Sequence, residues 1–208
     1  MDDLTITING LYKKNRDNFY GDLHRRNGQR LRDMCAHNGG VYIKIGQHLA
    51  MLDHVLPREY QESLVTLLAD TPQSTYEAVE RVFMEDFQKK PTEVFDSFDP
   101  KPIASASLAQ VHIAYKNNQK FAVKVQHEGL RDGSDADRLV ITKIVDVLSS
   151  QFREFNYRWL TKEMNDNLPL EMDFRNEYKN IQEITNDLKP MIEDGDVAVP
   201  TPISQYTS

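Results

Sequence analysis

The stretch PIASASLAQVHIAYKNNQKFAVKVQ, residues 102–126, decides the fold of this chain of 208 residues. Apolar and polar side chains alternate along residues 111–115 and again along residues 121–125, and this period of two is typical of a β-strand. The Asn-Asn-Gln sequence at 117–119 supplies a turn between the two runs. The stretch therefore predicts a β-hairpin.

Ala104, Ser105, Ala106 and Ser107 precede the hairpin, at a place where a loop that wraps phosphate groups would usually contain glycine. Glycine lets the backbone approach a phosphate closely and adopt positive φ, whereas alanine restricts both. The four residues are therefore either a phosphate loop that is stiffer than usual or an ordinary turn that enters a strand.

The second strand of the hairpin places three apolar side chains on one face and Lys124 on the other. Taken alone, Lys124 is a surface lysine on a solvated face. However, Glu177 falls inside the apolar stripe of a helix predicted after Pro169, and a buried unpaired carboxylate costs several kcal/mol. We expect Lys124 and Glu177 to form a mostly buried ion pair, the arrangement with which kinase-like folds hold the phosphates of ATP.

The composition is that of an ordinary globular protein, with 39% hydrophobic and 27% charged residues. A formal charge of −7 argues against a nucleic acid partner. Cys35 is the single cysteine, which excludes a disulfide framework and a cysteine zinc site, and the histidines lack metal-ligand spacing. No apolar run approaches the roughly 20 residues of a membrane span, and the first residues resemble neither a signal peptide nor a mitochondrial presequence.

The chain is organised in two parts, because the period changes from helical to alternating after FDSFDPKP at 95–102. The predicted fold class is α+β, with a helical N-terminal extension over residues 1–97 and a small antiparallel sheet with its helices over residues 98–208. Helices are predicted at 41–52 (with Val41, Ile45, Leu49 and Leu52 facing inward), after Pro57, after Ser74, over 135–155 and from Pro169 to about Leu188, and 197–206 is compatible with another strand.

Four motifs occur in a specific order and spacing. They are KIGQ (Lys44, Gly46 and Gln47), PIASASLAQVH (102–112), FAVKVQ (121–126) and LEMDFRNE, with Glu171, Asp173 and Glu177. They resemble the Lys-x-Gly-Gln signature, the alanine-rich nucleotide loop, the strand with the invariant lysine, and the Glu-x-Asp pair with the helix glutamate of the UbiB (aarF-domain, ADCK-type, ABC1-like) atypical kinases. The resemblance covers most of residues 30–200 and implies a partial protein-kinase-like N-lobe.

The resemblance implies that ATP is the cofactor and that a nucleotide is the main partner. The residues expected to bind it are Ala104, Ser105, Ala106, Ser107, Lys124 and Glu177. The residues expected to regulate the site are Lys44, Gly46, Gln47, Glu171 and Asp173. In the family the Lys-x-Gly-Gln helix lies over the nucleotide, so Lys44 is expected to point toward the loop and Glu171, and phosphorylation of a protein substrate is not expected.

The spacing alone leaves simpler interpretations of the same residues open. The helix that contains Lys44 and Gln47 is then a solvated amphipathic helix, and Glu171 forms a surface pair with Arg175 one turn later.

A kinase-like enzyme also needs a catalytic-loop aspartate and an Asp-Phe-Gly metal ligand after the helix glutamate. The residues that follow Glu177 contain neither motif, and LRDMCAHN (31–38) mimics a catalytic loop only by coincidence. The resemblance therefore stops within the N-lobe. We expect the C-lobe to be absent, the isolated chain to be catalytically inactive, no protein metal ligands, and Mg²⁺ binding only if that lobe is supplied.

The family is associated with mitochondrial lipid and ubiquinone metabolism, which implies a mitochondrial location although no targeting sequence is present. Two alternatives remain open from the sequence. The chain could be a non-catalytic module that binds a lipid, a membrane surface or a protein through its exposed helices. The basic run LHRRNGQRLRD (23–33) is either a contact with acidic lipid or a solvated helix face. The chain could also be a degenerate, truncated product.

Overall fold

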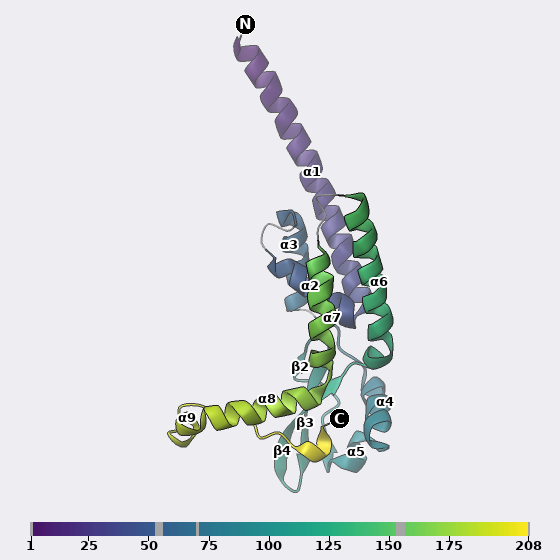
Figure 1. Ribbon diagram of the computed structural model, residues 1–208, viewed down its shortest axis with the longest axis vertical. Helices are drawn as coiled ribbons and strands as arrows, with labels where there is room; N and C mark the ends of the chain where they lie inside the picture. Colours follow the sequence, from purple (N-terminus) through teal and green to yellow (C-terminus); the bar gives the residue numbers. More distant parts are fainter. Residues whose placement is uncertain (1, 53–55, 70, 153–156, 208) are drawn as a thin grey trace. The chain divides into compact units, whose positions relative to one another are not determined.

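The computed structural model describes residues 2–52, 56–69, 71–152 and 157–207, with side chains from residue 18 onward (Figure 1). The chain divides into two compact units, Met1–Ser134 and Asp135–Ser208. This division follows packing and does not test the proposed functional boundary between residues 97 and 98, which stays a prediction.

Helices make up the beginning of the first unit. They are α1 (Asp2–Asn38), α2 (Gly40–Met51), α3 (Arg58–Leu64), the 3-10 helix η1 (Val65–Leu68), α4 (Tyr76–Phe87) and α5 (Pro91–Val94). Gly39 lies between α1 and α2, and Gly40 is the first residue of α2. They have φ of 72° and 43°, a conformation that residues with a side chain disfavour. Thr75 caps α4 by accepting a hydrogen bond from the Ala78 N–H. The helices predicted at 41–52, after Pro57 and after Ser74 are confirmed.

The helical part of this unit has its core where α1, α2, α3 and η1 meet. Cys35, Leu64 and Leu67 form a buried cluster there, and Leu49 packs against it. Within α2 the buried residues are Val41, Ile43 and Gly46. The predicted inward stripe is therefore partly wrong, because Ile43 is buried while Ile45 and Leu49 are only half-buried.

The predicted hairpin is confirmed as the centre of a four-stranded antiparallel sheet. Its strands are β1 (Ser97–Phe98), β2 (Ala104–Ser105), β3 (Ala109–Lys116) and β4 (Gln119–Gln126), and β3 pairs with all the others. Asn117 and Asn118 form the turn with φ of 51° and 62°, the left-handed pair that suits the twist of a two-residue hairpin.

The two faces of this sheet differ in what covers them. Directly paired residues of antiparallel strands carry side chains on the same face. The core face contains Phe98, Ser105, Gln110, His112, Ala114, Phe121, Val123 and Val125, and the open face contains Ala104, Val111, Ile113, Ala122 and Lys124. The rings of Phe98 and Phe83 of α4 lie 5.6 Å apart in an edge arrangement, so aromatic packing joins α4 to the core face.

The alternation along β3 predicted a strand but not which of its faces is buried. Gln110 and His112 are buried at 1% and 0% exposure, while Val111 and Ile113 are only half-buried. Along β4 the predicted division is confirmed, because Val125 is buried and Lys124 lies on the opposite face.

The second unit is helical in its described part. The helix α6 (Leu130–Gln151) begins in the first unit and continues into the second, where α7 (Arg158–Met172), α8 (Phe174–Asp187), α9 (Lys189–Glu193) and the 3-10 helix η2 (Ser204–Tyr206) follow. Asn165 of α7 joins the two long helices, because its amide donates to the Thr142 hydroxyl and its carbonyl accepts from Arg138.

Three expectations for this unit need correction or fall outside the description. Pro169 lies inside α7 rather than at the start of a helix, and the next helix begins at Phe174. Residues 197–207 contain a turn of 3-10 helix and no strand. The end of the helix predicted at 135–155 falls on residues 153–156, which lie outside the described residues. Among the described helices none is both long and apolar enough to cross a membrane.

Candidate functional site

The alanine-rich loop at 104–107 consists of β2 and the first residues of the tight connection from β2 to β3. Ala104 and Ser105 form β2, and the Ala106 N–H donates to the Ala109 carbonyl at 2.8 Å. None of residues 104–107 has positive φ, so the backbone makes no demand that only glycine could meet. This explains how alanine and serine can occupy the position that usually carries glycine.

The carbonyl groups of this loop are occupied by other parts of the unit. The Ser105 carbonyl accepts from the Thr71 hydroxyl at 2.8 Å, and the Ala106 carbonyl accepts from His127 Nε2 at 2.9 Å. The Leu108 carbonyl accepts from the His127 N–H at 3.1 Å. In contrast, the N–H groups of Ser107 and Leu108 donate to no acceptor among the described residues. Ser107 and Leu108 are buried, at 6% and 8% exposure. Backbone N–H groups without a protein acceptor would suit an anion that reaches them.

Lys124 lies in one register row with the start of this loop. Ala104 pairs with Val111, and Val111 pairs with Lys124, so the three side chains share the open face. Ala104 and Lys124 are separated by two strand spacings, which puts their Cα atoms roughly 10 Å apart. The extended lysine side chain can therefore meet the same ligand as the loop.

The open face around this row is partly apolar. Val111 and Ile113 are half-buried, and Ala122, which pairs with Ile113, is exposed. An apolar surface beside a lysine and a loop with N–H donors can receive an aromatic base on one side and an anionic group on the other.

The Lys-x-Gly-Gln motif joins α2 to η1. A Cβ atom on Gly46 would lie 2.5 Å from Leu67 Cδ1 and 3.2 Å from Cys35 Sγ, so a larger residue would displace the buried Leu67 side chain. Gln47 Nε2 donates to the Leu67 carbonyl at 2.8 Å. Lys44 is half-buried on the same helix. Two of the three motif residues therefore fix the position of η1, a role that the sequence did not predict.

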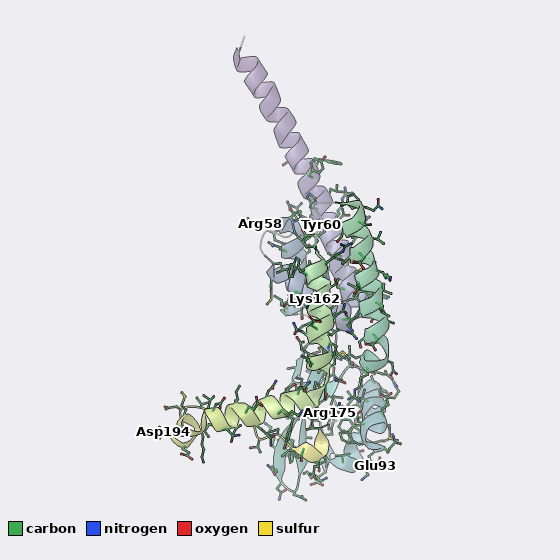
Figure 2. The ribbon with its side chains drawn as sticks, viewed as in Figure 1. Arg58, Tyr60, Glu93, Lys162, Arg175 and Asp194 are labelled. Atoms are coloured by element: carbon green, nitrogen blue, oxygen red, sulfur yellow. The ribbon has the colours of Figure 1, made fainter. Side chains whose placement is uncertain are left out.

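Asp173 and Arg175 form a local ion pair. Arg175 lies at the start of α8, next to the end of α7 (Figure 2). The Asp173 carboxylate accepts from Arg175 Nε at 2.8 Å and from its backbone N–H at 3.0 Å, which caps α8. The hydrogen bond from the Arg175 side chain is the main reason why the pKa of Asp173 is lowered. The alternative left open by the sequence, a surface pair of Glu171 and Arg175, does not hold, because Arg175 pairs with Asp173.

The expectation of a mostly buried pair of Lys124 and Glu177 also needs correction. Lys124 is exposed, Glu177 is half-buried, and α8 buries none of its residues. The argument that placed Glu177 in a core therefore fails. Lys124 lies in the first unit and Glu177 in the second, as do Lys44 and Glu171, so both pairings stay predictions.

Sequence reasoning missed the residues that hold the loop. Thr71, Ser74 and His127 lie outside the four motifs, and Gln110 lies inside the alanine-rich motif but was given no role. The one available hint was that polar residues occupy alternate positions of β3. In the described part of the chain, no group of three or more His, Cys, Asp or Glu side chains is arranged to hold a metal ion.

The ABC1 atypical kinase-like domain matches residues 66–208, which is more than half of the chain. An ABC1 protein of Arabidopsis thaliana is 42% identical over 172 residues, covering 82% of this chain and 32% of the relative. The AarF domain-containing protein kinase 1 of Gallus gallus is 41% identical over 168 residues, covering 80% of this chain and 32% of the relative. The chain thus spans about a third of the length of these relatives.

A solved complex of Rv3197 with erythromycin from Mycobacterium tuberculosis is 27% identical, with a TM-score of 0.44. The match covers 82% of this chain and 44% of that chain.

Proposed function

The chain belongs to the ABC1 atypical kinase-like family, and on this premise we propose that its partial kinase-like N-lobe binds ATP on the open face of the sheet. The observation that carries the proposal is the row of Ala104, Val111 and Lys124, which puts a cation and the alanine-rich loop on one face. A bound nucleotide would supply the phosphate groups for both.

Each part of the site has a separate task in this proposal. The Ser107 and Leu108 N–H groups donate to phosphate oxygens, and the Lys124 ammonium balances the phosphate charge. Val111, Ile113 and the neighbouring alanines contact the base. The pairing of Glu177 with Lys124, which the family resemblance implies, stays a prediction. Mg²⁺ would bind through the phosphates, and in kinase-like enzymes its protein ligands come from the Asp-Phe-Gly and catalytic-loop motifs.

The test measures the binding of a fluorescent ATP analogue to wild type, Lys124→Ala and Lys120→Ala. Lys120 lies on the same strand and is exposed, but it pairs with Tyr115, away from the loop. We expect Lys124→Ala to weaken binding about tenfold or more and Lys120→Ala to leave it unchanged, since the loss of a charge-assisted contact costs roughly 1.5–3 kcal/mol. Equal losses in both variants would reduce the role of Lys124 to general surface charge.

Phosphoryl transfer is a proposal for the full-length relatives, of which this chain spans about a third. Residues 178–208 contain no Asp-Phe-Gly and no Arg-Asp-x4-Asn sequence. Because the transition state needs metal ions that bridge the β- and γ-oxygens, we expect these 208 residues to bind the nucleotide without turning it over. An ATP hydrolysis assay that finds turnover lost in Lys124→Ala would contradict this expectation.

We extend the family's associations to this chain as a proposal of a mitochondrial role in lipid or ubiquinone metabolism. It predicts that the tagged full-length protein co-localises with a mitochondrial marker and that its loss changes the lipid or ubiquinone content. A cytosolic distribution with unchanged lipids would count against it.

A second candidate function is contact with an anionic lipid surface through α1. Phe19 and Tyr20 are 61% and 50% exposed, and Arg26 and Arg30 are exposed on the following turns. Exposed aromatic rings beside arginines suit a membrane interface, where each basic residue contributes about 1 kcal/mol. Sedimentation with phosphatidylserine vesicles should fall in the double variant Arg26→Ala/Arg30→Ala, and equal binding to neutral vesicles would refute the electrostatic part.

A further inference from the structure

Residues 71–74, which we call the strap, run alongside the alanine-rich loop in the first unit. The Thr71 hydroxyl donates to the Ser105 carbonyl at 2.8 Å, and the Ser105 hydroxyl donates to the Pro72 carbonyl at 3.0 Å. The two segments are 33 and 34 positions apart along the chain at these contacts. This reciprocal pair fixes β2 against the strap through side chains and not through a strand ladder.

Ser74 ties the other end of the strap to the buried side of the sheet. Its N–H donates to Gln110 Oε1 at 2.8 Å, and its carbonyl accepts from Gln110 Nε2 at 3.2 Å. Gln110 is 1% exposed, so these bonds are shielded from water. Breaking them would leave buried polar groups unpaired.

His127 connects the strap to the tip of the loop. A carbonyl can only accept a hydrogen bond, so the contact of His127 Nε2 with the Ala106 carbonyl places the ring proton on Nε2 in the neutral ring. Nδ1 then accepts from the Ser74 hydroxyl at 2.7 Å. The His127 backbone N–H also donates to the Leu108 carbonyl. His127 thus binds the loop at two carbonyls, those of Ala106 and Leu108.

The strap also continues directly from the part of the chain that the Lys-x-Gly-Gln motif holds. Thr71 comes three positions after Leu68, the last residue of η1, and Gln47 binds the carbonyl of Leu67. The Lys-x-Gly-Gln motif therefore binds, through Gln47, the element that precedes the strap in the sequence.

We propose that the strap and His127 are positioning elements for the phosphate loop, which they hold so that the Ser107 and Leu108 N–H groups remain available to a phosphate. This inference rests on the proposed nucleotide function. Its structural half, that the strap immobilises the loop, holds without any ligand. Thr71, Ser74 and His127 act through the loop and need not touch the nucleotide.

The experiment compares Thr71→Val and Ser74→Ala with the matched control Thr66→Val. The Thr66 hydroxyl donates to the Ser63 carbonyl at 2.8 Å, an exposed local contact away from the loop. Amide hydrogen exchange is measured without nucleotide at Ile103 and Ala106, whose N–H groups are bonded in the β2–β3 connection. We expect exchange to rise about five- to tenfold in the two strap variants and to stay unchanged in Thr66→Val, as the loss of one hydrogen bond predicts.

The second readout is the affinity of the same variants for the fluorescent ATP analogue. We expect it to fall about fivefold in Thr71→Val and Ser74→Ala, and to return in Thr71→Ser, which keeps the hydroxyl. Unchanged loop exchange in the strap variants would overturn the inference even if wild type binds ATP. Faster exchange with unchanged affinity would overturn the positioning role. If wild type does not bind the analogue, the proposed function fails, while the exchange data still decide whether the strap holds the loop.

Discussion

The two faces of the sheet use polar and apolar residues in opposite ways. The core face buries Gln110 and His112, and the open face leaves Val111 and Ile113 half-buried and Lys124 exposed. A hydrophobic pattern alone would assign these faces the other way round along β3. What decides burial is whether a polar group finds partners inside, not whether it is polar.

The buried polar residues of the core face are well paired. Gln110 uses its oxygen for the Ser74 N–H and its nitrogen for the Ser74 carbonyl and His112 Nε2. His112 Nδ1 donates to the Asp99 carbonyl at 2.8 Å. The open face has the reverse character, because its apolar side chains Val111 and Ile113 are only half-buried. The core face therefore serves the fold, and the proposed nucleotide site lies on the open face.

The largest expected effect is on the free energy of unfolding, and it compares a packed residue of the core face with an exposed residue of the open face. Phe98 is 8% exposed, and its ring lies 4.9 Å from the His112 ring and 5.6 Å from the Phe83 ring. Phe98→Ala should lower the free energy of unfolding by about 3–5 kcal/mol because it leaves a cavity. Tyr115→Ala, at an exposed position of β3, should cost less than about 1 kcal/mol. Urea unfolding followed by circular dichroism measures both, and similar losses would mean that the faces do not differ in burial.

Gln110→Ala tests the polar network of the core face. The substitution leaves the Ser74 N–H and carbonyl without their partner, so we expect a loss of about 2–3 kcal/mol in the free energy of unfolding. Gln119→Ala, on the exposed first residue of β4, should change it by less than about 0.5 kcal/mol. A Gln110→Leu variant as stable as wild type would show that shape, and not hydrogen bonding, holds this position.

The pH dependence tests the neutral state of His112. Burial is the main reason why its pKa lies below the ordinary value of 6.5, and the hydrogen bond to Asp99 acts in the opposite direction. Because the unfolded chain then binds more protons, the stability that His112 contributes is present above about pH 6.5 and is lost as the pH falls toward the folded pKa. His112→Asn should reduce this acid sensitivity measured by thermal unfolding, and His37→Gln, at an exposed position, should preserve it. If the loss of thermal stability with falling pH is the same in His112→Asn as in wild type, other groups cause the acid sensitivity.

Sequence reasoning found the elements whose signal is local. Alternation predicted β3 and β4, and helix periodicity with Pro57 and Ser74 predicted α3 and α4. It failed where long-range partners decide the outcome. Gln110 is inside because Ser74, 36 positions earlier, completes its hydrogen bonds, and no local pattern contains that information. The motif residues were found by resemblance, but the packing role of Gly46 depends on Leu67 and Cys35, which only the fold brings together.

The smallest expected stability effect compares neighbouring residues of β3 that receive the same substitution. Ile113 lies on the open face and is half-buried, so Ile113→Thr keeps a β-branched side chain and should cost less than about 1 kcal/mol. Ala114 is 0% exposed on the core face, so Ala114→Thr forces additional atoms and a hydroxyl into packed surroundings and should cost about 1–3 kcal/mol.

The same pair sharpens the functional side of the comparison. If the open face receives the base of ATP, Ile113→Thr should lower the affinity for the fluorescent ATP analogue about three- to tenfold. The reason is that the lost apolar contact is worth roughly 1 kcal/mol. Ala114→Thr should affect the affinity only as far as it unfolds the protein, which is checked by measuring binding at a temperature where both variants are folded. A large loss of stability in Ile113→Thr would show that the open face is in fact covered. A small loss of stability with unchanged affinity would move the base to another surface, because Ile113 would then contact neither the protein core nor the ligand.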